Sequence, residues 1–397
     1  MAPSIDIPTF ISRASATTTI TAAATATSST KRQKLKDDNH QQPLLPGLPD
    51  HIAQLCLNLV PPSTLYSVCH SWRRVIYTSA FPPFLSLYSL SSSTATSSRN
   101  NPTLQLSSFD PISSKWTVVT SSPPNLRRVC LRHPSFIARN LPVQAISVAG
   151  KLVFLAGTSA DLLPALSHPL IFNPISDTWS SGPPLSTARR WCAAGVSRAT
   201  VVVASGIGSH FTQTVARSVQ KWKFRETNNL NNKHEDSKGV WKKMKSLGDV
   251  KFSRDAIDAV GCRGKLYMVT GKEGVVYDVN SDEWSTLPEG MMGGWRGPAA
   301  AMEEETIYMV DELKGVLRKY DNVMDVWVDV LEDERLKGAK HIAAGGGRVC
   351  VVRCGGVGIL VVDVVSSPPR LWVVDTPAGQ QLLGLHILPR MCPPEFQ

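Results

Sequence analysis

The spacing of apolar residues changes near residue 84, and the change separates two regions of the chain. Between residues 44 and 83, apolar positions recur every three or four residues, which is the spacing of an amphipathic helix. Asp50 can cap the first such helix. The proline pair at 61–62 ends it, because proline has no amide hydrogen to donate to the helical ladder. The apolar stripe of this first helix consists of Ile52, Leu55 and Leu59.

A second helix is predicted after the proline pair, with Ser63 as its cap. Its apolar stripe consists of Leu65, Val68, Cys69, Trp72 and Ile76. Two or three short helices in about forty residues are too few to form an independent core. Such a unit exposes apolar surface unless something covers it. It therefore either docks on a partner or packs against the domain that follows.

From residue 84 onward, short strands repeat, and a tryptophan closes each unit after about 51 residues on average. Tight turns precede several of these tryptophans, as in "FNPISDTW" (172–179) and "YDVNSDEW" (277–284), where Asn, Asp, Pro and Ser favour turns between strands. Four short strands per unit, repeated around a ring, predict an all-β six-bladed propeller. The six tryptophans are Trp116, Trp179, Trp241, Trp284, Trp327 and Trp372.

The two ends of the repeated region complement each other. The first unit has no strand upstream of "FLSLYSL" and "LQLSSFD", whereas "QLLGLHILP" (381–389) follows the last tryptophan without a partner. We therefore predict that a C-terminal strand at 382–388 completes the first blade and closes the ring. The predicted domains are a tail at 1–43, a helical segment at 44–83 and a propeller at 84–397.

The net charge of +10 is unevenly distributed, with +15 on residues 44–254 and −7 on residues 255–397. Such asymmetry biases the side from which charged partners approach. The basic residues are dispersed over strands and loops without an aromatic-interleaved stripe, so we do not expect nucleic-acid binding. No apolar run of about 18 residues occurs, so no membrane span is predicted.

The sequence lacks the patterns that carry catalysis or metal binding. Its eight cysteines include no CxxC pair, and its nine histidines show no ligand spacing, so neither a metal site nor a disulfide scaffold is expected. No GxSxG, Walker A, HExxH or dinucleotide fingerprint is present. The glycine-rich run at 345–358 lies in a strand–turn–strand setting, which is unlike a phosphate-binding loop. We therefore expect no catalytic residues and no cofactor.

The tail at 1–43 is rich in Ala, Thr and Ser and should be disordered. Its "KRQKLK" run (Lys31 to Lys36) is either a nuclear-localisation patch or a solvated charge run. A hydroxyl-rich, acid-poor N-terminus is also compatible with an organelle transit peptide.

The helical segment carries a specific resemblance. "LPDHIAQLCL", a proline break and "LYSVCHSWRRVI" resemble the F-box, the module that binds the Skp1 adaptor of cullin-based ubiquitin ligases. The connection between the two helices is a few residues shorter than in the family, which leaves the middle helix unassigned. The resemblance implies a Skp1 partner, a cullin bound through it, and a location in the nucleus and cytoplasm. It also implies an adaptor-binding surface formed or supported by Leu48, Pro49, Ile52, Leu55, Val68, Cys69 and Trp72.

The repeats resemble kelch repeats, although the double glycine of that repeat occurs clearly only at Gly355-Gly356. Together, the two resemblances identify residues 44–397 as similar to the plant F-box/kelch-repeat proteins of the Skp1-interacting type. They imply an all-α F-box followed by an all-β six-bladed kelch-type propeller. The implied function is the substrate-recognition subunit of a Skp1–cullin–F-box (SCF) E3 ubiquitin ligase. The alternatives are a kelch interaction scaffold outside any ligase and a propeller enzyme.

A basic residue stands just before, or close to, the innermost predicted strand of several blades. The series consists of Arg139, Arg190, Arg254, Arg296 and Lys340. Its spacing follows that of the tryptophans, so these side chains should surround one mouth of the central channel. We hypothesise that they bind the target protein through an acidic or phosphorylated degron. The alternative is that they pair with carboxylates or backbone carbonyls within the chain.

Overall fold

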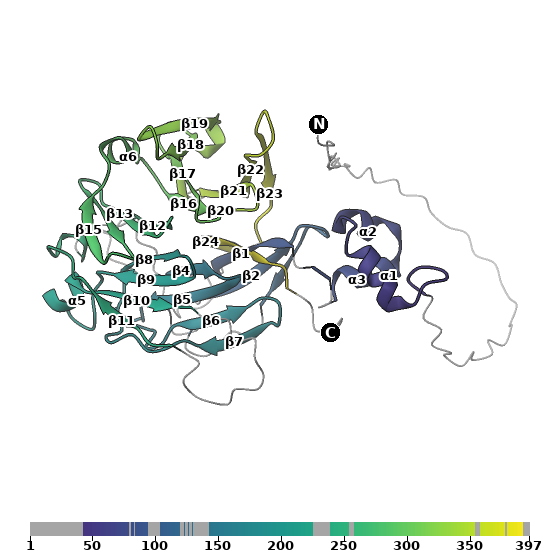
Figure 1. Cartoon of the computed structure of the whole chain (residues 1–397), viewed down its shortest axis with the longest axis horizontal. Coiled ribbons are helices and arrows are strands. Elements are labelled where there is room, and N and C mark those ends of the chain that lie inside the picture. Colours follow the sequence, from purple (N-terminus) through teal and green to yellow (C-terminus); the bar gives the residue numbers. More distant parts are fainter. Residues whose placement is uncertain are drawn as a thin grey trace, which may run out of the picture. The chain divides into compact units, whose positions relative to one another are not determined.

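In the computed structural model, three short helices precede six four-stranded antiparallel sheets (Figure 1). The innermost strands of successive sheets contact one another in the order β4, β8, β12, β16, β20, β24 and back to β4, so the sheets are the blades of a closed ring. The structure describes residues 43–78, 81–82, 84–93, 104–119, 123, 126, 129, 143–224, 239–253, 258–353, 358–377 and 379–391.

The helical segment contains three helices. Two of them occupy the range in which the sequence pattern predicted a single second helix. The three helices are α1 (Asp50–Leu57), α2 (Pro62–Val68) and α3 (His70–Ile76). The predicted second helix is broken at Cys69, whose backbone is extended with φ −157° and ψ 169°. The Cys69 sulfur accepts a hydrogen bond from the Trp72 amide at 3.5 Å and so caps α3.

Both predicted side-chain caps were wrong. Pro49 is the cap residue of α1, and Asp50 is the first helical residue, its carboxylate accepting from the Leu44 amide at 3.1 Å. Pro62 is the first residue of α2, ahead of Ser63. Proline fits this position because the first helical amide needs no intrahelical partner. The second proline of the pair therefore starts a helix rather than ending one.

The helices share a small apolar core. Trp72 is half-buried at its edge, and its indole nitrogen donates to the Leu44 carbonyl at 2.8 Å. This bond ties the segment before α1 to α3. The buried members of the core are Leu57, Leu65, Val75, Ile76 and Phe81.

Each blade has four antiparallel strands, which follow one another from the centre of the ring outward. In that order, blade 1 contains β24 (Gln380–Pro389), β1 (Leu85–Ser93), β2 (Leu104–Asp110) and β3 (Lys115–Val118). Blade 2 contains β4 (Val143–Val148), β5 (Lys151–Gly157), β6 (Leu170–Asn173) and β7 (Thr178–Ser181). Blade 3 contains β8 (Ala193–Ser197), β9 (Thr200–Ala204), β10 (Val219–Lys223) and β11 (Lys242–Met244).

The remaining blades follow the same order. Blade 4 contains β12 (Asp258–Cys262), β13 (Lys265–Val269), β14 (Gly274–Asp278) and β15 (Glu283–Thr286). Blade 5 contains β16 (Ala299–Met302), β17 (Thr306–Asp311), β18 (Val316–Asp321) and β19 (Val326–Glu332). Blade 6 contains β20 (Ala339–Gly345), β21 (Arg348–Arg353), β22 (Ile359–Asp363) and β23 (Arg370–Val374). Short helical turns between strands are α5 (Gln213–Arg217), η2 (Lys251–Ser253), α6 (Glu289–Gly294) and η3 (Glu334–Leu336).

Blade 1 combines the two ends of the repeated region. β24 pairs with β1 from Leu85↔Pro389 to Ser93↔Gln380, and the ladder has one irregularity. Leu385 and Leu388 of β24 are each 1% exposed. The C-terminal strand is therefore the innermost strand of the first blade, and it buries apolar side chains on either side of the ring closure.

Four of the periodic tryptophans join neighbouring blades. Trp284 lies opposite Tyr277 within blade 4, with ring centres 4.9 Å apart, and its indole nitrogen donates to the Lys245 carbonyl at the end of blade 3. Equivalent indole bonds run from Trp116, Trp241 and Trp327 to Asp375, Pro183 and Met291. A large aromatic with one donor suits this place, because its ring packs while its N–H reaches the next sheet.

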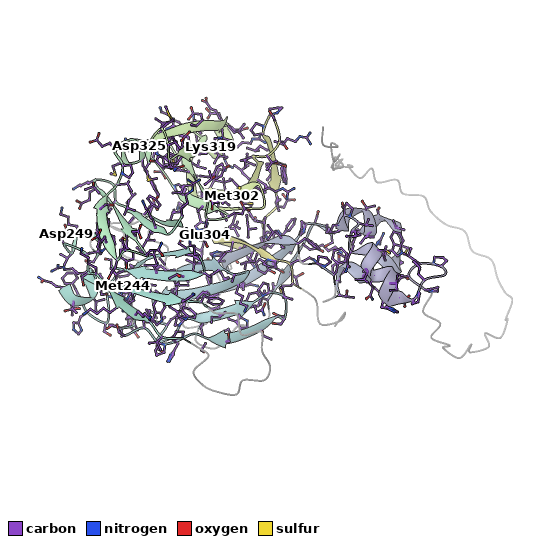
Figure 2. The ribbon with its side chains drawn as sticks, viewed as in Figure 1. Met244, Asp249, Met302, Glu304, Lys319 and Asp325 are labelled. Carbon is purple, nitrogen blue, oxygen red and sulfur yellow. The ribbon has the colours of Figure 1, made fainter. Side chains whose placement is uncertain are left out.

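Carboxylates in the outer turns add a second set of joints. Asp325, labelled in Figure 2, lies in the turn between β18 and β19 of blade 5. Its oxygens accept from the Gly290 and Met291 amides at 2.9 Å each and from the Tyr320 hydroxyl at 2.6 Å. These bonds hold α6, which follows blade 4, against blade 5. They also lower the pKa of Asp325, chiefly through the bond from Tyr320.

A polar cluster around Arg390 connects the helical segment to blade 1. The Arg390 guanidinium lies 3.7 Å from the centre of the Tyr77 ring, and its Nε is 3.3 Å from Asp110 Oδ1. The Tyr77 hydroxyl donates to Asp110 Oδ2 at 3.1 Å, and the Arg390 amide donates to the Phe84 carbonyl at 2.7 Å. Burial and the neighbouring Asp110 raise the pKa of Tyr77, so its hydroxyl remains a donor. We call these four residues the Arg390 cluster.

Candidate functional site

The helical segment leaves one apolar face uncovered. Leu48, Ile52 and Leu55 are 39%, 38% and 63% exposed, although Ala53 and Leu57 on the other side of α1 are buried. Ile52 and Leu55, three residues apart, lie on one side of α1, and Leu48 lies just before the helix. We use the name exposed helical face for the exposed apolar side chains of α1, its two flanks and α2, which are Leu48, Ile52, Leu55, Leu59 and Val68.

The seven predicted adaptor-binding residues occupy two kinds of position. Leu48, Ile52, Leu55 and Val68 lie on the exposed helical face, and Pro49 and Cys69 are also exposed as the residues that cap α1 and α3. Trp72 instead packs against the helical core, which is a supporting position and not an exposed one. The prediction left out Leu59, which is 87% exposed. Its place in the apolar stripe of the sequence was the signal that could have found it.

The propeller has two ends that carry different loops. At the loop end, outer strands connect to the innermost strand of the next blade, as residues 182–192 do between β7 and β8. At the hairpin end, the two innermost strands of a blade turn into each other, as at Arg263–Gly264 between β12 and β13. Antiparallel pairing puts these connections at opposite ends of each sheet.

The three described members of the predicted cationic series lie at the loop end, but they are not equivalent. Arg190 and Arg296 precede β8 and β16, and Lys340 is the second residue of β20 rather than a residue before it. Arg190 is 9% exposed, whereas Arg296 and Lys340 are exposed to solvent. Arg296 donates to the Trp295 carbonyl at 3.1 Å, so one of its donors is satisfied within the chain. Arg139 and Arg254 lie outside the described residues.

The hairpin end has a different electrostatic character. A hollow there is lined by Arg198, Arg263 and the three glutamates at 303–305. The Arg263 Nε lies 3.3 Å from the Glu305 carboxylate, and its amide donates to the carbonyl of Glu304, which is labelled in Figure 2. The cations at this end therefore have anionic neighbours.

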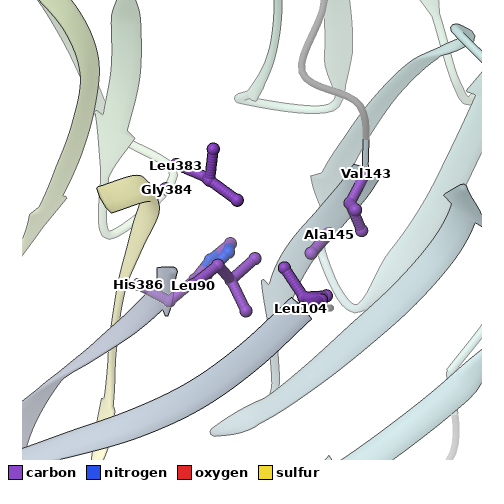
Figure 3. A pocket seen from close by; sticks show the side chains of 7 residues that line it. All are labelled: Leu90, Leu104, Val143, Ala145, Leu383, Gly384 and His386. Carbon is purple, nitrogen blue, oxygen red and sulfur yellow. The ribbon is translucent and has the colours of Figure 1, made fainter. Parts of the chain in front are cut away.

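A small pocket between blades 1 and 2 is apolar (Figure 3). Its lining consists of Leu90, Leu104, Val143, Ala145, Leu383, Gly384 and His386. Burial, reinforced by the nearby His341, lowers the pKa of His386 to about 3. Burial likewise lowers the pKa of His341 to about 4. The imidazole in this pocket is therefore neutral at physiological pH and does not supply a charge for ligand binding.

Within the described ranges, no cluster of three or more His, Cys, Asp or Glu side chains is arranged to hold a metal ion. Among the helices described, none is long and apolar enough to cross a membrane.

Six four-stranded blades, an outer tryptophan in each unit and three preceding helices define the class: a six-bladed β-propeller with an N-terminal helical segment. Comparison with known proteins gives the family. The chain is 47% identical over 379 residues to the F-box/kelch-repeat protein SKIP25 of Arabidopsis thaliana, covering 92% of this chain and 94% of that protein. The chain belongs to the F-box/kelch-repeat proteins.

More distant relatives come from the same plant. The F-box protein AFR is 24% identical over 342 residues, covering 79% of this chain and 82% of the relative. The F-box/kelch-repeat protein SKIP4 is 23% identical over 361 residues, covering 84% of this chain and 91% of the relative. No protein-family model matches the chain.

Proposed function

We propose that the protein is the substrate-recognition subunit of an SCF-type ubiquitin ligase, in which the helical segment binds Skp1 and the propeller binds the target. Membership of the F-box/kelch-repeat family supports both halves of this proposal. The single observation that carries it is the exposed helical face, because apolar side chains on a unit this small need a covering surface.

The size of that face fits a docking role. Burying a large aliphatic side chain contributes about 1.5–3 kcal/mol. Several such side chains together can offset the loss of translational and rotational freedom that association costs. Leu55 and Val68, at 63% and 53% exposed, have most of their surface available for a partner. They come from α1 and α2, so one partner surface would contact both helices.

In this proposal the chain contributes proximity and no chemistry of its own. A ubiquitin-conjugating enzyme recruited through Skp1 and a cullin performs the transfer, and the propeller raises the local concentration of the target. The loop end is the proposed target-binding end. Its cations Arg190, Arg296 and Lys340 suit an acidic or phosphorylated segment, and Arg139 and Arg254 extend the series in sequence.

Co-purification with Skp1 tests the adaptor half of the proposal. The wild-type chain is expected to retain Skp1, and the Leu55→Glu, Val68→Glu double variant to lose about 100-fold in affinity or more, because two charges would be buried at the interface. The matched control is Leu313→Glu, an equally radical change at a side chain 78% exposed in the turn between β17 and β18. This control is expected to bind like the wild type.

Trp72 is a poor probe of the same surface. Its indole bonds the Leu44 carbonyl and packs on the helical core, so Trp72→Ala would confuse unfolding with lost contact. If the folded wild-type chain does not retain Skp1, the ligase proposal fails. An interaction scaffold outside any ligase then becomes the better account.

A further inference from the structure

Two adjacent arginines are buried at the loop end of blade 3. Arg189 is 1% exposed and Arg190 is 9% exposed. Arg189 donates from Nη1 to the Ser205 carbonyl at 3.0 Å, but its Nη2 has no hydrogen-bond partner. The Nε and Nη1 of Arg190 are also buried without partners. Across the part of the chain that the structure describes, no carboxylate pairs with either guanidinium group.

This arrangement is unfavourable unless something else completes it. A buried donor without an acceptor loses its hydration and gains no bond in return, and the cost is larger for a charged group. Burial accordingly lowers the pKa of both arginines, although a guanidinium remains charged in proteins. An anion would supply both the missing acceptors and the missing charge.

The local backbone holds the Arg190 side chain in place. Arg190 exchanges two backbone hydrogen bonds with Ile207, at 2.9 and 3.0 Å, which join the loop before β8 to the loop after β9. The guanidinium carbon lies 4.5 Å from the centre of the Trp191 ring, a stacked cation–π contact. Trp191 itself has a φ of +54°, an uncommon conformation for a bulky residue.

The facing loop is adapted to this close approach. Gly206 has a φ of +99°, and a Cβ there would lie 2.9 Å from the Cys192 Cβ and 3.0 Å from the Arg190 carbonyl oxygen. Only glycine fits such a position without displacing the neighbouring backbone. Backbone outliers of this kind persist where surrounding structure enforces them, and they cluster at binding sites.

Two other arginines of the propeller, Arg263 and Arg296, differ from this pair, whereas Arg353 also has a buried Nε without a partner. Arg263 at the hairpin end has the Glu305 carboxylate as a neighbour, and Arg296 at the loop end is exposed and donates to a backbone carbonyl. The indole nitrogen of Trp191, beside Arg190, is a further buried donor without a partner. Unpartnered donors thus occur in three residues that follow one another in sequence, 189–191.

We infer that Arg189, Arg190 and Trp191 form an anion-binding subsite that receives a carboxylate or phosphate group of the target protein. The planar guanidinium groups match the oxygens of either group, and the indole adds a neutral donor. The assignment of the anion to a target rests on the proposed function of the propeller. Anion binding as such does not.

The first test measures anion binding without knowledge of the target. The melting temperature of the full chain is followed at pH 7.5 with increasing sodium phosphate, and sodium chloride keeps the ionic strength constant. A bound anion stabilises the folded state by mass action, so the wild type should gain about 2 °C or more. Arg190→Leu should lose this gain, and Arg190→Lys, which keeps the charge but not the planar fork, should keep part of it.

The matched control for this test is Arg370→Leu, which removes an exposed arginine of β23. Its gain with phosphate should equal that of the wild type. If the wild type shows no gain, or if Arg190→Leu gains as much as the wild type, the subsite does not exist.

The second test asks where the anion comes from. Degenerate peptide libraries with a fixed central phosphoserine, glutamate or glutamine are passed over the immobilised full chain. Retention of the phosphoserine or the glutamate library at least about 10-fold above glutamine, lost in Arg190→Leu, would support the inference and identify the group. Equal retention of all three libraries would overturn the assignment to a target. If the wild-type chain does not bind Skp1 but is still stabilised by phosphate, the ligase proposal is wrong and the anion-binding subsite is still supported.

Discussion

The three N-terminal helices and the propeller blades both carry apolar residues at regular spacings, but they bury these residues to different extents. In blade 3, Val201 and Val203 are fully buried between neighbouring sheets. In and just after α1, Leu55 and Leu59 remain 63% and 87% exposed. The propeller covers the apolar side chains of its inner strands because each blade has a neighbour on both sides, whereas apolar side chains in its outer turns, such as Leu313, are exposed. The helices have only a small core of their own, so a larger part of their apolar surface is left for the partner that we propose.

The largest expected effect comes from removing the innermost strand of blade 1. A chain that ends at Pro377 lacks β24, which pairs with β1 along its whole length and buries Leu385 and Leu388. We expect this chain to lose cooperative thermal unfolding, because blades 1, 2 and 6 each lose packing at the closure. Calorimetry measures the transition.

The counterpart is a chain without residues 43–76, which lacks all three helices but keeps Tyr77. It should unfold cooperatively, since the blades do not depend on the helices for their cores. If both deletions abolished the transition, the two regions would not differ as described.

Substituting single leucines tests the same comparison with smaller expected changes in the free energy of unfolding. Leu388→Ala in β24 should cost about 2–5 kcal/mol of the free energy of unfolding, because it leaves a cavity in the blade core. Leu55→Ala in α1 should change stability by about 0.5 kcal/mol or less, because that side chain is exposed. Urea denaturation gives both values. A large loss in Leu55→Ala would mean that the exposed helical face is covered within the chain.

The Arg390 cluster tests whether the two regions are coupled. Arg390→Met keeps the bulk of the side chain but removes the partner of Asp110, both of which are largely buried. Removing a hydrogen-bonding partner of a charged group should cost about 1.5–3 kcal/mol. A double-mutant cycle with Tyr77→Phe should show non-additivity, since Tyr77 and Arg390 share the Asp110 carboxylate. Additive effects would indicate that the helices and blade 1 are independent.

The last prediction concerns pH. The pKa values of His341 and His386 are lowered to about 4 and about 3 by burial, below the value of about 6.5 in an unfolded chain. Between these pKa values the unfolded state binds more protons than the folded state. The contribution of the two neutral histidines to the free energy of unfolding is therefore fully present above pH 6.5 and decreases as the pH falls. Each histidine contributes a slope of about 1.4 kcal/mol per pH unit at most. The double variant His341→Asn, His386→Asn should flatten the profile of urea midpoints from pH 7 to pH 5; an unchanged slope would contradict this account.

The sequence was most informative where interactions are local and repeated. The turn between Tyr277 and Trp284 involves only neighbouring residues, so its sequence pattern can be recognised wherever a blade uses the same turn. The break at Cys69 was missed because the apolar stripe continues through it, and only the extended backbone with its sulfur cap shows the end of α2. Arg190 and Arg296 looked equivalent because their burial depends on loops distant in sequence, such as the one that carries Ile207.

Blade 1 combines strands that are synthesised at very different times, because its innermost strand comes from the other end of the repeated region. β1, β2 and β3 leave the ribosome before the other described strands, but their innermost partner β24 is the last of them. Until β24 has been translated, one edge of β1 therefore lacks its native neighbour, and an unpaired edge is a template for incorrect pairing. A late stop codon would damage the first blade as much as the last. Because Arg390 follows β24, its bonds to Asp110 and Phe84 can form only after all the described strands have been translated.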